Sequence, residues 1–153
     1  MKTCFILAAM LLMAVPRLSA QRLVVGGRAP ELAVSEWLTA APVTEDRTVM
    51  VEFFHSANRN SAARIAALDE IARNYAGRLC VVVVTRQDEP QARAMLLDGQ
   101  PHYSVGYDAD GTVSAAFAAN YIPYAVIYDR RGRVLWAGNP SSLGVQEIAQ
   151  YVK

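Results

Sequence analysis

The residues whose types could do chemistry lie in one polar loop between two apolar stretches. The loop reads His55-Ser56-Ala57-Asn58-Arg59-Asn60-Ser61. An imidazole and a hydroxyl in the same loop could form a base-assisted nucleophile, which would make His55 and Ser61 a hydrolytic pair. Such a pair needs a third group to orient the base, and the nearby acid, Glu52, is expected to point into the core. A structural histidine is therefore the favoured interpretation, with a hydrolase at His55 and Ser61 kept as an alternative.

The cysteines decide what redox chemistry is open to the chain. The sequence has two, Cys4 and Cys80. Cys80 lies in the apolar run 79–84, where a thiol packs as a small hydrophobe. A reactive thiol needs exposure and a positive environment, so exchange through Cys80 by a mixed disulfide with a partner is a second, less favoured alternative. We expect no cofactor and no metal ion.

The first twenty residues have the pattern of a secretory signal peptide. Lys2 is followed by the apolar run 4–15, and Ala20 offers a small residue at the cleavage point. The run is shorter than the roughly 20 apolar residues of a membrane span. We predict a signal peptide at 1–20, cleavage near Ala20, and a periplasmic or secreted domain at 21–153 without a membrane span. Export would leave Cys80 without a partner for an intramolecular disulfide.

The composition bounds the size and the partners of the protein. A chain of 153 residues with 53% apolar residues suits one domain with a real core. Removal of Lys2 and Arg17 with the signal peptide leaves one more acidic than basic residue, with both signs mixed along the chain. This near-neutral balance argues against a nucleic-acid partner and against an anionic membrane.

The elements around the loop predict an α/β fold. An apolar strand at 49–54, a helix at 63–75 and an unalternating strand at 79–84 form a parallel, right-handed unit. The later pattern predicts a helix at 88–97, strands at 102–107, 124–128 and 133–137, a helix at 111–120 and a last helix capped by Ser142. The lead-in 21–47 is irregular, with one or two short edge strands. The order predicts a thioredoxin-like fold, a central mixed sheet flanked by helices with an inserted helix and strand.

Across nearly all of 21–153 the sequence resembles the exported TlpA-like thiol–disulfide oxidoreductases. The resemblance rests on the order and spacing of several segments, which are 25–30, 51–54, 65–71, 107–111, 121–123 and 136–140. In that family the strand–loop–helix junction holds a Cys-x-x-Cys pair. The resemblance puts those two cysteines at Asn58 and Ser61, a helix-kinking proline at Ala66, a buried acid at Glu52 and a cis-proline at Pro123.

The resemblance therefore implies the family's scaffold without its reacting atoms. Disulfide exchange needs one sulfur to attack and another to resolve the mixed disulfide, and Asn58-Arg59-Asn60-Ser61 offers neither. Asn58, Asn60 and Ser61 are instead good residues for a helix N-cap. We expect Glu52 to be a structural acid whose pKa burial raises, bonded to water or backbone.

A binding surface is what such a site could still offer. In the family the cis-proline loop bonds an extended substrate chain, and Ile122 and Pro123 match that loop. Arg59, beside the amides of a helix start, could receive a carboxylate or a peptide carbonyl. We therefore expect a non-catalytic module of the cell envelope that binds a peptide or protein partner through Arg59, Ile122 and Pro123. A site without any ligand is the remaining alternative.

Overall fold

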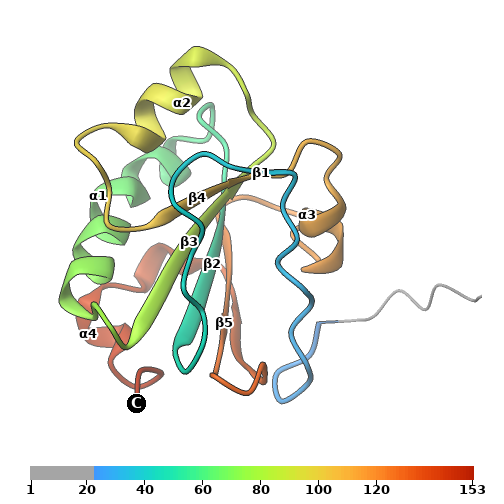
Figure 1. The fold of residues 1–153 in the computed structure, drawn as a ribbon, viewed down its shortest axis with the longest axis vertical. Helices are drawn as coiled ribbons and strands as arrows, with labels where there is room; N and C mark the ends of the chain where they lie inside the picture. The colour runs from blue at the N-terminus through green and yellow to red at the C-terminus, as the bar shows by residue number, and fades with distance from the viewer. Residues whose placement is uncertain (1–22) are drawn as a thin grey trace, which may run out of the picture.

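The computed structural model describes residues 23–153, and the predicted signal peptide lies outside them. A six-stranded sheet runs through the described part in the order β1-β4-β3-β2-β5-β6 (Figure 1). Its strands are β1 Glu36–Trp37, β2 Thr48–Phe54, β3 Leu79–Thr85, β4 Ser104–Tyr107, β5 Tyr124–Tyr128 and β6 Val134–Gly138. The β2–β3 and β3–β4 pairs are parallel, and the other pairs are antiparallel. The predicted mixed α/β sheet is confirmed.

The helices cover both faces of this sheet. They are α1 Arg59–Asn74, α2 Pro90–Leu97, α3 Thr112–Ala116 and α4 Val145–Ile148, with a 3-10 turn at Pro140–Ser142. Helices α1, α2 and α4 contribute to the core on one face. Helix α3 and the N-terminal segment cover the other face (Figure 1). None of the described helices is long and apolar enough to cross a membrane.

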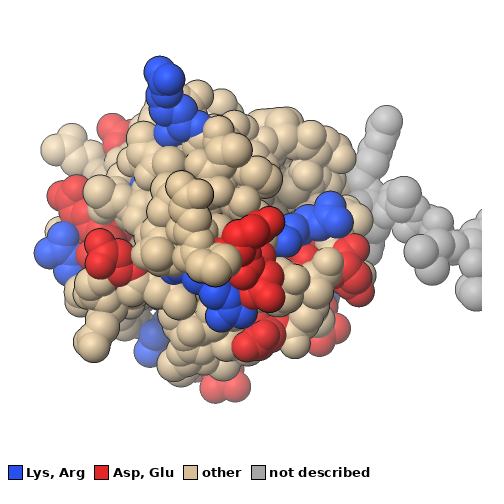
Figure 2. All heavy atoms as spheres, turned by 90° about the horizontal axis from the view of Figure 1, so that it is seen from above, with Lys and Arg blue, Asp and Glu red and all other residues tan. Residues whose placement is uncertain are grey.

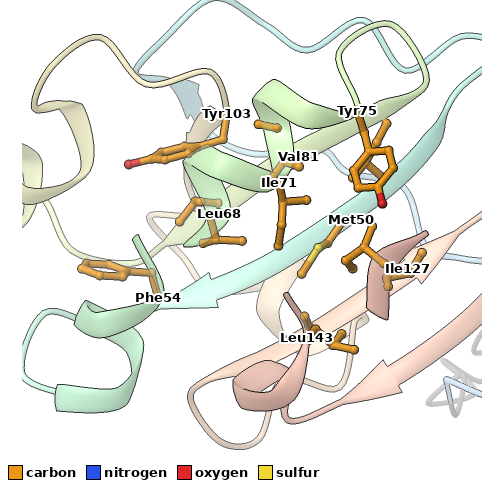
Figure 3. Packing of buried hydrophobic residues seen from close by; sticks show 14 of the residues in the cluster. Met50, Phe54, Leu68, Ile71, Tyr75, Val81, Tyr103, Ile127 and Leu143 are labelled. Atoms are coloured by element: carbon orange, nitrogen blue, oxygen red, sulfur yellow. The ribbon is translucent and has the colours of Figure 1, made fainter. Parts of the chain in front are cut away.

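The two central strands divide the core into two layers. All seven residues of β2 and all seven of β3 are buried, which explains why neither strand alternates in sequence. Met50 and Phe54 belong to the same core layer as Leu68 and Ile71 of α1 (Figure 3). The alternate residues Val49, Val51 and Phe53 face the other layer, where the ring centroids of Phe53 and Phe117 lie 5.8 Å apart. Burial of each such large side chain stabilises the fold by about 1.5–3 kcal/mol.

Several helix boundaries differ from those predicted, by two residues at the start of α2 and by more at α1, α3 and the last helix. Helix α1 starts four residues earlier than the apolar pattern indicates, because the Asn58 side chain caps it. Helix α3 ends at Ala116, since the backbone turns to a positive φ of 55° at Ala118. The prediction that Ser142 caps the last helix is wrong. Ser142 closes the 3-10 turn, and the Glu147 carboxylate instead accepts a hydrogen bond from the Gly144 amide at 2.9 Å.

Candidate functional site

The polar loop lies at the carboxyl end of β2 and leads directly into α1. Its first residue, His55, is exposed, whereas Ser61 on the first turn of α1 is 1% exposed. The His55 amide donates to the Ser61 hydroxyl oxygen at 3.2 Å. The His55 imidazole Nδ1 accepts from the Ala57 amide at 3.2 Å. Within residues 23–153 no hydrogen bond joins the imidazole to the Ser61 hydroxyl, so both groups serve the shape of the loop.

Asn58 connects the start of α1 to the proline loop. Its side-chain oxygen accepts from the Ser61 amide at 3.0 Å, which is the N-cap bond of the helix. Its side-chain nitrogen donates to the Ile122 carbonyl at 2.7 Å. The Ile122–Pro123 peptide bond is cis, and Pro123 is buried. One amide therefore joins two segments that are far apart in the sequence.

The site also contains a residue that sequence reasoning missed. The Gln87 side chain accepts from the Ser56 amide at 2.6 Å and donates to the Ser56 hydroxyl at 2.9 Å. Gln87 follows β3, so this pair fixes the loop after β2 to the end of the neighbouring strand. Both strands are parallel, and their carboxyl ends meet at this edge of the sheet. The expected adjacency of these two strand ends is the sequence feature from which the contact between Ser56 and Gln87 could have been predicted.

Glu52 is paired with a side chain, which differs from the bonding to water or backbone that we expected from the sequence. Arg64 on α1 is 6% exposed, and its guanidinium binds both carboxylate oxygens of Glu52. Burial raises the pKa of Glu52, and the hydrogen bonds and charge of Arg64 oppose that rise. The sequence could have predicted that Arg64 faces the core, because it lies at helical spacing from Leu68 and Ile71 on the buried face.

A hollow of about 380 Å³ opens beside the loop. Its apolar floor comes from Phe53, Phe54 and Val84 at the ends of the central strands. The remaining lining residues are His55, Arg86, Gln87, Glu89, Ser114, Ala119 and Ile122. The hollow therefore lies between the polar loop, the end of β3 and the residue before the cis-proline.

Two of the predicted motif residues lie on the surface. Arg59 and Asn60 are both exposed on the first turn of α1. Neither belongs to an ion pair among the residues that the structure describes. Their side chains are therefore accessible from the end of the molecule that carries the loop.

Cys80 is far from the loop, near the start of β3. It pairs with Val49 across the parallel strands and is 7% exposed. Burial raises the pKa of its thiol to about 11, with Arg47 opposing the rise. At neutral pH the thiol is therefore protonated, which disfavours the mixed-disulfide alternative. No group of three or more metal-ligating side chains gathers within residues 23–153.

Comparison with known proteins finds similarity in structure alone. No family model and no curated protein matches the sequence. A structure described as the thiol:disulfide interchange protein DsbE from Chlorobium tepidum shares 21% identity, with a TM-score of 0.65 over 75% of this chain and 84% of that one. The thioredoxin domain of a thiol-disulfide oxidoreductase from Bacteroides vulgatus shares 13% identity, with a TM-score of 0.67 over 86% of this chain and 99% of that one.

A third similar structure is a secreted disulfide oxidoreductase from Mycobacterium tuberculosis that is homologous to DsbE of E. coli. It shares 15% identity, with a TM-score of 0.59 over 70% of this chain and 84% of that one. Together with the strand order and the mixed pairing, these likenesses establish the fold. The chain has a thioredoxin-like fold.

Proposed function

We propose that this chain is an exported thioredoxin-fold protein that binds an extended peptide or protein segment without exchanging disulfides. The observation that carries the proposal is the Asn58 amide, which joins the Ser61 amide to the Ile122 carbonyl. The family resemblance places a redox cysteine at this position. An amide side chain cannot attack a disulfide, and the hydroxyl of Ser61 is no substitute for a resolving thiol. The site keeps its connections while its sulfur chemistry is absent.

The surface beside Asn58 suits an extended chain. The hollow offers an apolar floor for one side chain, with Arg86 and Glu89 at its rim. Tyr121, which is 50% exposed, stacks edge-on at 5.2 Å against Tyr124 and extends this surface past the proline loop. Apolar pockets with a few polar groups at the edge are the usual form of a binding site. Arg59 on the first turn of α1 adds a cation for a carboxylate or a carbonyl of the ligand.

The signal-peptide pattern at 1–20 supports a periplasmic or secreted location for this activity. In that compartment a partner would be another exported protein or a segment of one.

An affinity capture from an envelope extract tests the proposal. The wild type is compared with an Arg59→Glu/Ile122→Ser variant and with Arg73→Glu, which makes the same charge change at the far end of α1, where Arg73 is paired with Asp69. Equal melting temperatures would establish that all three are folded. We expect some partners to be captured by the wild type and by Arg73→Glu but not by Arg59→Glu/Ile122→Ser. Equal recovery of every partner by all three proteins would overturn the proposal.

The absence of catalysis is tested separately by the reduction of insulin disulfides. We expect no rate above the uncatalysed reaction. An activity that disappears in Cys80→Ala would contradict the non-catalytic assignment and restore the Cys80 alternative.

A further inference from the structure

A cluster of cations lies at the end of the molecule opposite the polar loop. Arg28 and Arg133 are partners in a β-bridge, and with Arg131 they line a hollow of about 180 Å³. Arg130, Arg131 and Lys153 line a neighbouring hollow of about 430 Å³. All five side chains are exposed, and we refer to them together as the basic end. In Figure 1 the turn between β5 and β6 and the C-terminus both lie at the bottom of the view.

Two carboxylates offset part of the charge of the basic end, and its five cations outnumber them. Among the described residues none of its five cations belongs to an ion pair. Two carboxylates, Asp46 and Asp129, line the larger hollow. Asp129 is engaged with the backbone of its own turn, since it accepts from the amides of Arg131 and Arg133 at 2.8 and 2.9 Å. Seen from the opposite end, acidic and basic side chains are interspersed (Figure 2).

An exposed apolar turn is held beside these cations. Val24 and Val25 are 60% and 64% exposed. Their turn is closed by the Gly27 amide, which donates to the Val24 carbonyl at 2.9 Å. It is fixed to β6 by the Gly26 amide, which donates to the Val134 carbonyl at 2.8 Å, and by the Val134 amide, which donates to the Gly27 carbonyl at 2.9 Å. The two valines therefore project from a fixed position next to the arginines.

We propose that the basic end docks this protein on an anionic phospholipid surface. The guanidinium groups would pair with headgroup phosphates, for which their planar donors are suited. Val24 and Val25 would enter the boundary between the headgroups and the acyl chains. Aliphatic rather than aromatic side chains are the most exposed apolar groups beside the arginines, which favours a lipid over a single-stranded nucleic acid.

Docking in this way would orient the candidate site. Strand β2 begins at Thr48, which lines the larger hollow of the basic end, and finishes at Phe54, just before the polar loop. A strand of this length spans roughly 20 Å. The hollow beside the polar loop would therefore face the aqueous phase, away from the lipid. The near-neutral total charge argued against an anionic membrane. That total combines the basic end with an opposite end where acidic and basic side chains are interspersed (Figure 2), so it does not describe the basic end alone.

Vesicle sedimentation of the full chain tests the proposal. Binding to vesicles of phosphatidylcholine with phosphatidylglycerol is compared with binding to phosphatidylcholine alone, which measures any attachment through the apolar N-terminus. We expect Arg131→Gln/Arg133→Gln to lose about 30-fold of the phosphatidylglycerol-dependent affinity. The Arg73→Gln/Arg93→Gln variant removes two cations that are paired with Asp69 and Asp88 elsewhere on the protein, and it should lose much less. Val24→Ser/Val25→Ser should weaken binding even at high salt.

Hydrogen exchange of the wild type provides a readout that needs no variant. Anionic vesicles should protect amides in 24–28 and 130–133 and leave 56–60 unchanged. Equal losses in the two arginine variants, or no preference for phosphatidylglycerol, would overturn the proposal. Binding to duplex DNA that is tighter than binding to vesicles, with the same dependence on Arg131 and Arg133, would assign the basic end to a nucleic acid instead.

Discussion

Arg64 and Glu52 form a two-pronged ion pair in the interior of the protein. Nε of Arg64 lies 3.1 Å from one carboxylate oxygen of Glu52, and Nη2 lies 3.0 Å from the other. The remaining nitrogen, Nη1, donates to the Leu143 carbonyl at 2.6 Å. The guanidinium thus joins α1, β2 and the C-terminal segment just below the polar loop.

Loss of Arg64 alone should destabilise the protein strongly. Arg64→Met leaves the buried Glu52 carboxylate and the Leu143 carbonyl without a donor, and a broken buried pair costs about 3–5 kcal/mol. The free energy of unfolding in urea measures the loss. The double variant Glu52→Leu/Arg64→Met removes both charges and should recover most of it. A single variant as stable as the wild type would show that the pair contributes little.

Arg64→Met should also change how the free energy of unfolding depends on pH. Without Arg64, only burial acts on Glu52 and raises its pKa in the folded state above the unfolded value of about 4.3. A raised folded pKa gives a stability contribution that is present below the unfolded pKa and is lost as the pH rises through the folded pKa. The deficit of Arg64→Met relative to the wild type should therefore be smaller near pH 4 than near pH 8. A Glu52→Gln/Arg64→Met control should show no such trend.

Two substitutions at Asn58 should separate its two hydrogen bonds. Asn58→Ala removes both and should cost about 0.5–2 kcal/mol, the usual value of an N-cap. Asn58→Asp retains an acceptor for the Ser61 amide but removes the donor to the Ile122 carbonyl. It should therefore loosen the 121–123 loop more than the helix, as measured by amide hydrogen exchange. Unchanged exchange in that loop would mean that the bond to Ile122 does not hold it.

Cysteines introduced at residues 58 and 61 should give the protein redox chemistry. The side chain of residue 58 reaches the amide of residue 61, so Asn58→Cys/Ser61→Cys places two thiols at adjacent positions on the first helical turn. A thiol at a helix N-terminus has a lowered pKa and reacts faster. We expect an intramolecular disulfide by mass spectrometry and insulin reduction above the parent's background. The single Ser61→Cys variant is the control. If it reduces insulin as fast as Asn58→Cys/Ser61→Cys, the activity does not need both cysteines and the prediction is wrong.

Alkaline pH should unfold the protein through buried phenols and the buried thiol. Burial raises the pKa of Cys80 to about 11 and the pKa values of Tyr103 and Tyr128 to about 12. Since these folded values lie above the unfolded ones, the associated stability is complete below about pH 8.5 and is lost as the pH rises toward 12. Ultraviolet titration should show tyrosines that ionise only on unfolding. Reversible ionisation of all seven near pH 10, with native circular dichroism, would contradict this.

The sequence predicted the fold better than the site because the two depend on different signals. The unalternating apolar residues of β2 and β3 indicate strands buried on both faces, and the structure confirms both. The Arg64 partner of Glu52 was missed although its helical spacing was readable, because a charged residue on an apolar face is easily assigned to the surface. The bond from Asn58 to Ile122 depends on how the proline loop returns to α1, which no local pattern specifies.

The position of β5 has a consequence for the order of folding. Strand β5 lies between β2 and β6, and it pairs Val126 with Val51, a partner that is distant in the sequence. Pairing between such distant residues is slow, because a long loop must close before the contact forms. Until then one edge of β2 stays open to other strands, so a chain that emerges N-terminus first is most vulnerable to aggregation before Tyr124–Tyr128 arrives.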